Sequence, residues 1–285
     1  MGPEAATVVF GLLSAVAWGC GDFGGGTTTK RAPVLGVVLI VEVVGAVIAA
    51  GLALVLAEPL PSVPGLAFGV AAGLSGIIGI LALYQGLAVG RMGVVAPVAG
   101  VMGASIPVLA GIALEGLPSP IVLVGIGLGI VAVILVSRIP GPAGGRSGLE
   151  FGLAAGAGIA GFNVLISQLP EGEVFWPLAA LRLVSIPIVA AIVLLARRPW
   201  RVPRPALGPA SLVAVFDMAG NAFFILATQV GVLAVAVILS SMYPVVTVLL
   251  AVAILRERLT RTHAIGIAVA AVAITFIAGG QAAGP

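Results

Sequence analysis

VLGVVLIVEVVGAVIAAGLALVLA, residues Val34–Ala57, is an apolar run that a single carboxylate, Glu42, interrupts. A helix needs about 20 apolar residues to cross the hydrocarbon of a bilayer, so this run predicts a transmembrane helix. Arg182 occupies the matching place in a second apolar run, Trp176–Ala196. A charge at the centre of a membrane helix costs at least about 2.5 kcal/mol on insertion scales, and such residues usually mark a functional site. The two runs therefore predict a polar site inside a membrane domain.

The whole chain has the composition of a polytopic membrane protein. Its 285 residues are 61% hydrophobic and 8% charged, whereas a soluble domain carries about 25% charged residues. The apolar runs have helical length, while the strands of a membrane barrel would alternate over about 10 residues. We therefore expect an all-α integral membrane protein. Glu4 in place of a basic residue before the first run argues against a cleaved signal peptide.

Breaks rich in proline, glycine and charge divide the chain into ten predicted spans. The longest polar gap, residues 138–148, separates a predicted first five-helix unit, residues 5–137, from a second one, residues 149–280. The predicted spans are Ala5–Gly24, Val34–Ala57, Gly65–Val89, Met92–Leu114, Ile121–Ser137, Leu149–Ser167, Trp176–Ala196, Leu207–Val230, Val232–Leu255 and His263–Gly280.

The two units echo each other in sequence. Phe10-Gly-Leu12 recurs as Phe151-Gly-Leu153, and Glu42 then aligns with Arg182. Such self-similarity indicates an internal duplication. Because each unit has an odd number of spans, the second unit would be inverted relative to the first. Inverted repeats place a binding site near the bilayer midplane, as in secondary carriers.

The basic residues predict the orientation of the chain. Every Lys and Arg outside the spans follows an odd-numbered span. The excess of positive charge in cytoplasmic loops then places both termini outside. The same distribution explains the pI near 9.8 without a nucleic-acid partner, because the basic residues lie in short loops rather than in one patch.

The ninth and tenth spans carry a family resemblance. LSSMYPVVTVLLAVAILRERLT, residues Leu239–Thr260, followed by Gly266, resembles the end of an EamA repeat in the drug/metabolite transporter superfamily. There a proline-bearing helix leads to a Leu-x-Glu-x-Leu turn and a glycine-bearing last helix. Residues Pro107–Leu117 form a weaker version in the first unit, and Trp18 and Arg182 also look like family positions. The resemblance implies a ten-helix carrier with a central cavity lined by the first four helices of each repeat.

Two positions depart from the pattern of the family. Many relatives have arginine in the second span, where this chain has Glu42, and many have a basic loop after it, where this chain has EPLPSVP at Glu58–Pro64. The first departure leaves the charge of the substrate open, and the second makes the predicted orientation one to test.

Glu42 and Arg182 are the leading site candidates, each with a structural alternative. Glu42 could load and release a proton or contact substrate, because poor hydration raises the pKa of a carboxylate. Arg182 could bind a substrate carboxylate or phosphate through its planar fork. Alternatively, the two side chains form an ion pair that joins the halves, and breaking one partner would then destabilise the protein more than replacing both.

Further polar residues could line the same site. Asp217 and Asn221 are four residues apart on the eighth span and so share a helix face. They favour a cavity wall continued by Gln229, with Asp217 as a second proton-coupling candidate. Asp22 and Asn163 end the first and sixth spans at equivalent places, and for Asp22 we favour a membrane-interface position or bonds to the loop backbone.

The remaining candidates have simpler structural readings when each is taken alone. Trp18, Tyr84 and Tyr243 could stack on a substrate, but aromatic residues are also common at membrane surfaces. Pro244 is the best hinge candidate, with Pro107 as a second, because proline frees a helix carbonyl. For Glu115 and Glu257 the default is a place in a surface turn, with Arg256 and Arg258 forming an ion-pair cluster around Glu257.

The chain lacks the motifs of several enzyme classes. It has no Gly-x-x-x-x-Gly-Lys-Ser/Thr loop for ATP, and its single histidine and single cysteine cannot form the usual zinc or haem sites. We therefore expect no cofactor and no enzymatic activity, but a secondary active transporter of the cell membrane, monomeric or homodimeric. It would move a small organic metabolite or drug by alternating access, outward, with possible exchange for H+. The alternatives are a lipid translocator or a membrane-embedded lipid-modifying enzyme, and convergence of Glu42, Arg182 and Asp217 on one space would favour the carrier.

Overall fold

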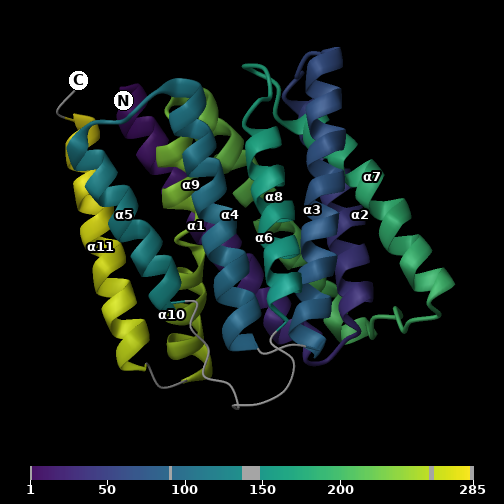
Figure 1. Ribbon diagram of the computed structural model, residues 1–285. Helices are drawn as coiled ribbons and strands as arrows, with labels where there is room; N and C mark the ends of the chain where they lie inside the picture. Colours follow the sequence, from purple (N-terminus) through teal and green to yellow (C-terminus); the bar gives the residue numbers. More distant parts are fainter. Residues whose placement is uncertain (1, 90–91, 137–147, 257–259, 283–285) are drawn as a thin grey trace.

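Apolar runs dictate helices here, because a backbone in hydrocarbon must satisfy its hydrogen bonds internally. The computed structural model describes residues 2–89, 92–136, 148–256 and 260–282, and within these ranges it is helical without strands (Figure 1). The helices are α1 (Pro3–Thr29), α2 (Val34–Val55), α3 (Val63–Val89), α4 (Met92–Glu115), α5 (Pro120–Val136), α6 (Leu149–Ile166), α7 (Phe175–Leu195), α8 (Arg204–Val230), α9 (Leu233–Ser240), α10 (Tyr243–Leu255) and α11 (Arg261–Ala282).

The all-α membrane fold predicted from the sequence is confirmed. Eight helical segments of the described chain are long and apolar enough to cross a membrane, with Leu233–Leu255 counted as one segment. Pro120–Leu135 and Arg261–Ile277 are shorter apolar helices. Large apolar side chains on the outer faces, such as Leu54 of α2 and Leu194 of α7, are exposed and would contact lipid.

The first span is longer than predicted, because α1 continues past Gly24 to Thr29. Three threonines follow the glycine run, and their hydroxyls donate to backbone carbonyls one turn earlier. Thr28 Oγ1 lies 2.7 Å from the carbonyl oxygen of Gly24, and Thr29 Oγ1 lies 2.9 Å from that of Gly25. These bonds give the threonine hydroxyls a partner within the helix itself.

The ninth span is divided rather than continuous. Helix α9 ends at Ser240 and α10 begins at Tyr243, with Pro244 in its first turn. Pro244 has no N–H to donate to the carbonyl of Ser240, and its ring would clash with that carbonyl in a continuous helix. By contrast, α4 continues through Pro107. The predicted hinge residue Pro244 thus lies beside a real break, while its motion stays a prediction.

The two halves of the chain interleave instead of forming separate bundles. Helix α1 packs most extensively on α8 and also on α9 and α10, while α3 and α4 pack on α6. Helix α2 packs on α7, and α5 packs on α11 at one edge of the molecule (Figure 1). Contacts between helices of the same half are much sparser.

Glycine permits the closest of these approaches. A Cβ added to Gly73 of α3 would lie 2.8 Å from the carbonyl oxygen of Leu181 in α7, and one added to Gly158 of α6 would lie 2.5 Å from the Cα of Gly79 in α3. Gly69, one turn before Gly73, approaches α7 in the same way, since its added Cβ would lie 2.7 Å from the carbonyl oxygen of Pro177.

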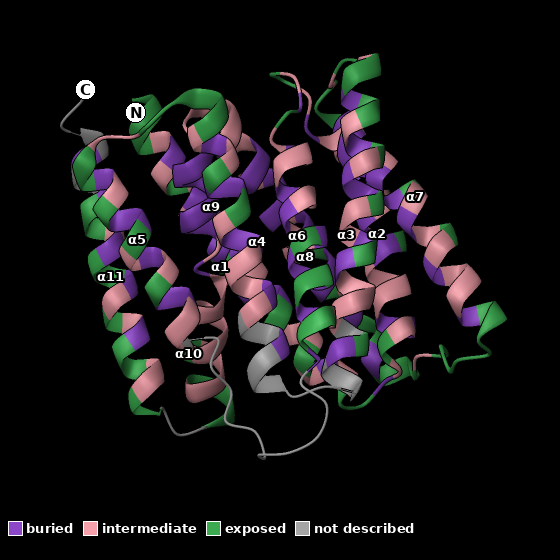
Figure 2. Ribbon diagram, viewed as in Figure 1, coloured by how far each residue is buried: buried purple, intermediate pink, exposed green. Residues whose placement is uncertain are grey.

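The molecule has two different ends, which we call the terminal face and the basic face. The terminal face carries both termini and the turns 56–62, 116–119, 167–174 and 231–232, at the upper end in Figure 1. The basic face carries the turns 30–33 and 196–203 and the residues Arg256 and Arg261. On the terminal side, every residue of α9 is buried (Figure 2).

Carboxylates join the turns of the terminal face to helix starts in the other half. Glu58 accepts hydrogen bonds from the backbone N–H groups of Val174, Phe175 and Trp176, at 2.8–3.2 Å, where α7 begins. Its oxygens satisfy N–H groups that have no partner within the helix, and its charge suits the positive end of the helix dipole.

Two further glutamates repeat this arrangement. Glu173 Oε1 accepts from the N–H of Ser62 at 3.0 Å, just before α3. Glu115 Oε2 accepts from the N–H of Leu233 at 2.8 Å, where α9 begins. Glu115, which the sequence placed in a surface turn, is the last residue of α4 and has this backbone partner in the other half, while Glu257 lies outside the described residues.

Replacing Glu58 with alanine should lower the free energy of unfolding by about 0.5–2 kcal/mol, the usual cost of losing a helix N-cap. Thermal unfolding of the detergent-solubilised protein, followed by tryptophan fluorescence, measures this loss. Glu171→Ala, in the exposed turn before α7, is the matched control and should leave the melting temperature unchanged. Equal melting temperatures for Glu58→Ala and wild type would contradict the capping role.

Candidate functional site

A cavity of about 550 Å³ lies between the two halves of the chain. It begins deep in the molecule, where Trp18 of α1 and Asn221 of α8 line it. It extends along α1 to Thr29 and reaches Val34, the first residue of α2. The cavity therefore approaches the basic face, while the buried helix α9 and the carboxylate caps lie on the terminal side.

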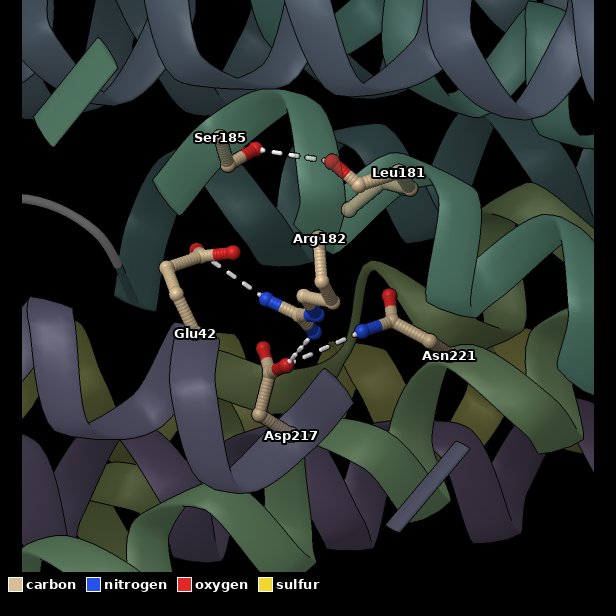
Figure 3. A network of polar contacts seen from close by, with 6 residues as sticks. All are labelled: Glu42, Leu181, Arg182, Ser185, Asp217 and Asn221. Atoms are coloured by element: carbon tan, nitrogen blue, oxygen red, sulfur yellow. Dashed lines mark hydrogen bonds and ion pairs between the residues drawn. The ribbon is translucent and has the colours of Figure 1, made fainter. Parts of the chain in front are cut away.

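Three charged side chains from three helices meet at this cavity (Figure 3). Arg182 of α7 places Nη1 3.0 Å from Oε1 of Glu42, which α2 supplies. Its Nη2 makes a close ion pair with Oδ2 of Asp217, which α8 supplies. Asn221, one turn further along α8, donates from Nδ2 to the same Asp217 oxygen at 3.1 Å. We call Glu42, Arg182, Asp217 and Asn221 the charged cluster.

Local sequence explains how this charged cluster fits between packed helices. A Cβ added to Gly45 of α2 would lie 3.2 Å from Nε of Arg182, so the glycine leaves room for the guanidinium. Asp217 and Asn221 are four residues apart and so lie on one face of α8. The hydroxyl of Ser185 donates to the carbonyl of Leu181 within α7, at 3.2 Å, rather than to a side chain of the charged cluster (Figure 3).

The members of the cluster differ in their access to the cavity. The Arg182 and Glu42 side chains are only 5% and 6% exposed, whereas the Asp217 side chain is 32% exposed. Among the described residues, Oε2 of Glu42 and Nε of Arg182 have no hydrogen-bond partner. Charges this far from water depend on one another, because an unpaired buried ion costs several kcal/mol. The ion pairs of the cluster thus link three helices, while one carboxylate oxygen and one guanidinium nitrogen have no hydrogen-bond partner in the described chain.

Three further sequence candidates also line this cavity. Trp18, Tyr243 and Asn163 line it, and the rings of Trp18 and Tyr243 meet edge to face at 6.3 Å. Asn163 also donates to the carbonyl of Gly103 at 3.3 Å. The side chain of Tyr84 lies outside the described residues.

Two sequence interpretations need correction. Asp22 was expected near the membrane interface or bonded to loop backbone, but it lines the cavity within α1, because that helix continues to Thr29. Gln229 was expected to continue the polar stripe of α8 along a cavity wall. Instead its Nε2 donates to the carbonyls of Pro170 and Glu173 at 3.0 and 3.1 Å, in the turn before α7.

A helical period in the first span could have identified the position of Asp22. Trp18, Asp22, Gly25 and Thr29 follow one another at three or four residues, and all of them line the cavity. This spacing places them on one face of a helix, provided that the helix runs through the glycines. The glycine run instead predicted that the helix stops at Gly24.

Comparison with known proteins agrees with the fold and the sequence motifs. Residues 146–279 match the model of the EamA-like transporter family, the family that the motifs of the ninth and tenth spans resemble. One solved crystal structure of a protein resembles the chain with a TM-score of 0.76 at 18% sequence identity, and the match covers 95% of this chain and 96% of that one. At this identity the likeness shows a shared fold only. No curated protein matches the chain.

The cluster predicts unequal effects of breaking and of removing its charges. Arg182→Met should lower the free energy of unfolding by on the order of 3 kcal/mol, because it leaves two carboxylates without their partner. Arg182→Met combined with Glu42→Gln and Asp217→Asn should be more stable than the single variant. Melting temperatures in detergent test the comparison, and a triple variant less stable than Arg182→Met would contradict it.

Proposed function

We propose that this chain is an EamA-type secondary carrier that moves a small organic solute across the membrane by alternating access and exchanges it for protons. The observation that carries the proposal is the meeting of Glu42, Arg182 and Asp217 from three helices at one cavity between the halves. A lipid translocator would need a groove open sideways to lipid, and a lipid-modifying enzyme a nucleophile or acidic metal site near the interface. Charges that converge on one cavity between the halves favour the carrier.

The packing of the helices supports an inverted repeat of residues 5–137 and 149–280. If α1, α2, α3, α4 and α5 correspond in order to α6, α7, α8, the α9–α10 pair and α11, the contact between α1 and α8 corresponds to that between α6 and α3. The contact of α4 with α6 likewise corresponds to that of α9 and α10 with α1. The pairs α2–α7 and α5–α11 map onto themselves. A pseudo-twofold axis relating two inverted units accounts for all four relations.

The two faces support an alternating-access mechanism. In this structure the cavity approaches the basic face, which we propose to be cytoplasmic because it carries the excess of basic residues. Opening the terminal face would separate the caps that Glu58 and Glu173 form between the halves. The break between α9 and α10, next to Pro244, offers a place for the chain to bend during this change.

Proton exchange would occur at the charged cluster. Arg182 of α7 faces Glu42, and the carboxylates of Asp217 on α8 and Asp22 on α1 line the same cavity. Protonation of Glu42 would remove one of the two negative partners of Arg182 and so change how the guanidinium holds α2 and α8. Binding a proton on one side of the membrane and releasing it on the other would couple the proton gradient to solute export.

Glu42→Gln should abolish the coupling of transport to a pH gradient, because the amide cannot release a proton. Proteoliposomes containing the full chain and an internal pH-sensitive dye are screened with amino acids, nucleosides, sugars and organic amines. Wild type should show solute-dependent proton movement with at least one class, and Glu42→Gln should exchange that solute without moving protons. Unchanged proton movement in Glu42→Gln would eliminate Glu42 as the coupling group.

A bulky residue at Gly26 should block transport without unfolding the protein. A Cβ at this position meets no atom within 4 Å, and Gly26 lines the cavity. Leucine there would occupy the solute path. Gly208→Leu is a matched control, because a Cβ at Gly208 also meets nothing within 4 Å and this exposed helical residue lies outside the cavity. Solute exchange in proteoliposomes should fall at least tenfold in Gly26→Leu and be unaffected in Gly208→Leu, and equal rates would place the path elsewhere.

A further inference from the structure

We infer that the solute is an organic cation, a protonated amine with an apolar or aromatic body, whose charge is recognised by Asp22. This inference rests on the proposed function and names the substrate class of the same cavity. It differs from the expectation that a membrane arginine would attract an anionic substrate, which the sequence left open.

The charges that line the cavity do not balance. Among the described lining residues, Asp22, Glu42 and Asp217 are acidic and only Arg182 is basic. Arg182 already has two carboxylate partners, Glu42 and Asp217. An anionic substrate would therefore meet an arginine whose charge is committed, together with a third carboxylate. A cation would instead supply the charge that this part of the membrane domain lacks.

Asp22 is the carboxylate of this set that has no protein partner. It makes no hydrogen bond or ion pair with any residue that the structure describes, and its side chain is exposed where it lines the cavity. The space beside it is open, because a Cβ on Gly26 would meet nothing within 4 Å and one on Gly25 only Val213, at 3.8 Å. One turn of small residues thus leaves room for a ligand next to a free carboxylate.

The buried part of the site also offers an acceptor rather than a donor. Oε2 of Glu42 has no hydrogen-bond partner in the described chain, although the side chain is only 6% exposed and lines the cavity. The unpartnered donor, Nε of Arg182, lies against Gly45 on the α2 side, 3.2 Å from where a Cβ of that glycine would be. An ammonium group donates hydrogen bonds and would satisfy carboxylate oxygens.

Aromatic side chains stand beside these carboxylates. Trp18 precedes Asp22 by one turn on the same face of α1, and Tyr243 of α10 contacts the Trp18 ring. Phe162 of α6 also lines the cavity. Aromatic faces attract cations by about 0.5–2 kcal/mol, and a volume of about 550 Å³ lies within the range of roughly 300–1,000 Å³ typical of small-molecule sites.

The geometry favours an organic cation over a bound metal ion. No group of three or more His, Cys, Asp or Glu side chains in the described part of the chain lies close enough together to hold a metal. Asp22 and the charged cluster therefore surround a space instead of forming a compact set of ligands. An ammonium group attached to an apolar body fits such a space.

Three probes of matched shape and different charge test this inference: 3-phenylpropylamine, 3-phenylpropan-1-ol and 3-phenylpropionate. Binding to the purified full chain is measured by isothermal titration calorimetry in detergent at neutral pH, where the amine is cationic and the acid is anionic. We expect the amine to bind at least tenfold more tightly than the alcohol, a difference of about 1.4 kcal/mol. The acid should bind most weakly. Binding of the alcohol or the acid as tight as that of the amine, or no binding of any of the three, overturns the inference.

Variants assign the preference to Asp22. Asp22→Asn should remove the tenfold preference for the amine, whereas Asp22→Glu should keep it because the charge remains. Glu171→Gln removes an acid from an exposed turn outside the cavity and should bind like wild type. An amine preference that persists in Asp22→Asn overturns the role of Asp22.

The failure of this inference can be told apart from failure of the proposed function. If proteoliposomes exchange protons for an anionic or neutral solute only, the carrier stands and the cationic substrate class falls. If no solute class in the screen moves protons while the amine still binds in an Asp22-dependent manner, the binding site stands and the proton-coupled carrier falls.

Discussion

One guanidinium inside the membrane joins three helices that the sequence separates widely. Arg182 of α7 binds Glu42 of α2 and Asp217 of α8, so it links the first half of the chain to the second. None of these charges would be tolerated alone in hydrocarbon, because each depends on the others for compensation. The same three side chains line the cavity between the halves. One set of electrostatic contacts therefore both joins the halves and lies at the candidate site.

The two ends of the molecule are built by different physical means. Toward the terminal face, α9 is buried along its length and three glutamates satisfy N–H groups at or near helix starts. Toward the basic face, glycines of α1 leave open space, and the cavity extends to Thr29. The caps are hydrogen bonds between the halves, which can be exchanged for water at modest cost. This asymmetry is what a carrier requires if the two faces open in turn.

The local sequence predicted most helices because the length and continuity of an apolar run are sufficient for a helix in lipid. It failed at two places where local signals were misread or missed. Helix α1 continues through a glycine run to Thr29, and Pro244 lies beside a break in a run that is otherwise apolar throughout. The first of these errors also misplaced Asp22, since a residue near a predicted helix end was assigned to the interface. Glu42, Arg182, Asp217 and Asn221 were identifiable because polar groups in apolar helices are expensive.

The sequence by itself determined that this is a helical membrane protein with charged residues inside its spans and an EamA-type second half, because composition and motif are properties of the linear chain. Only the tertiary structure decided which charges compensate one another. Arg182 has two partners, and their distances depend on how α2, α7 and α8 cross. The tertiary structure also decided that Asp22 lines the cavity without a partner in the described chain. It decided that the side chains of Gln229 and Glu115 form hydrogen bonds with backbone groups at the terminal face. These outcomes depend on contacts between distant segments, which no local pattern encodes.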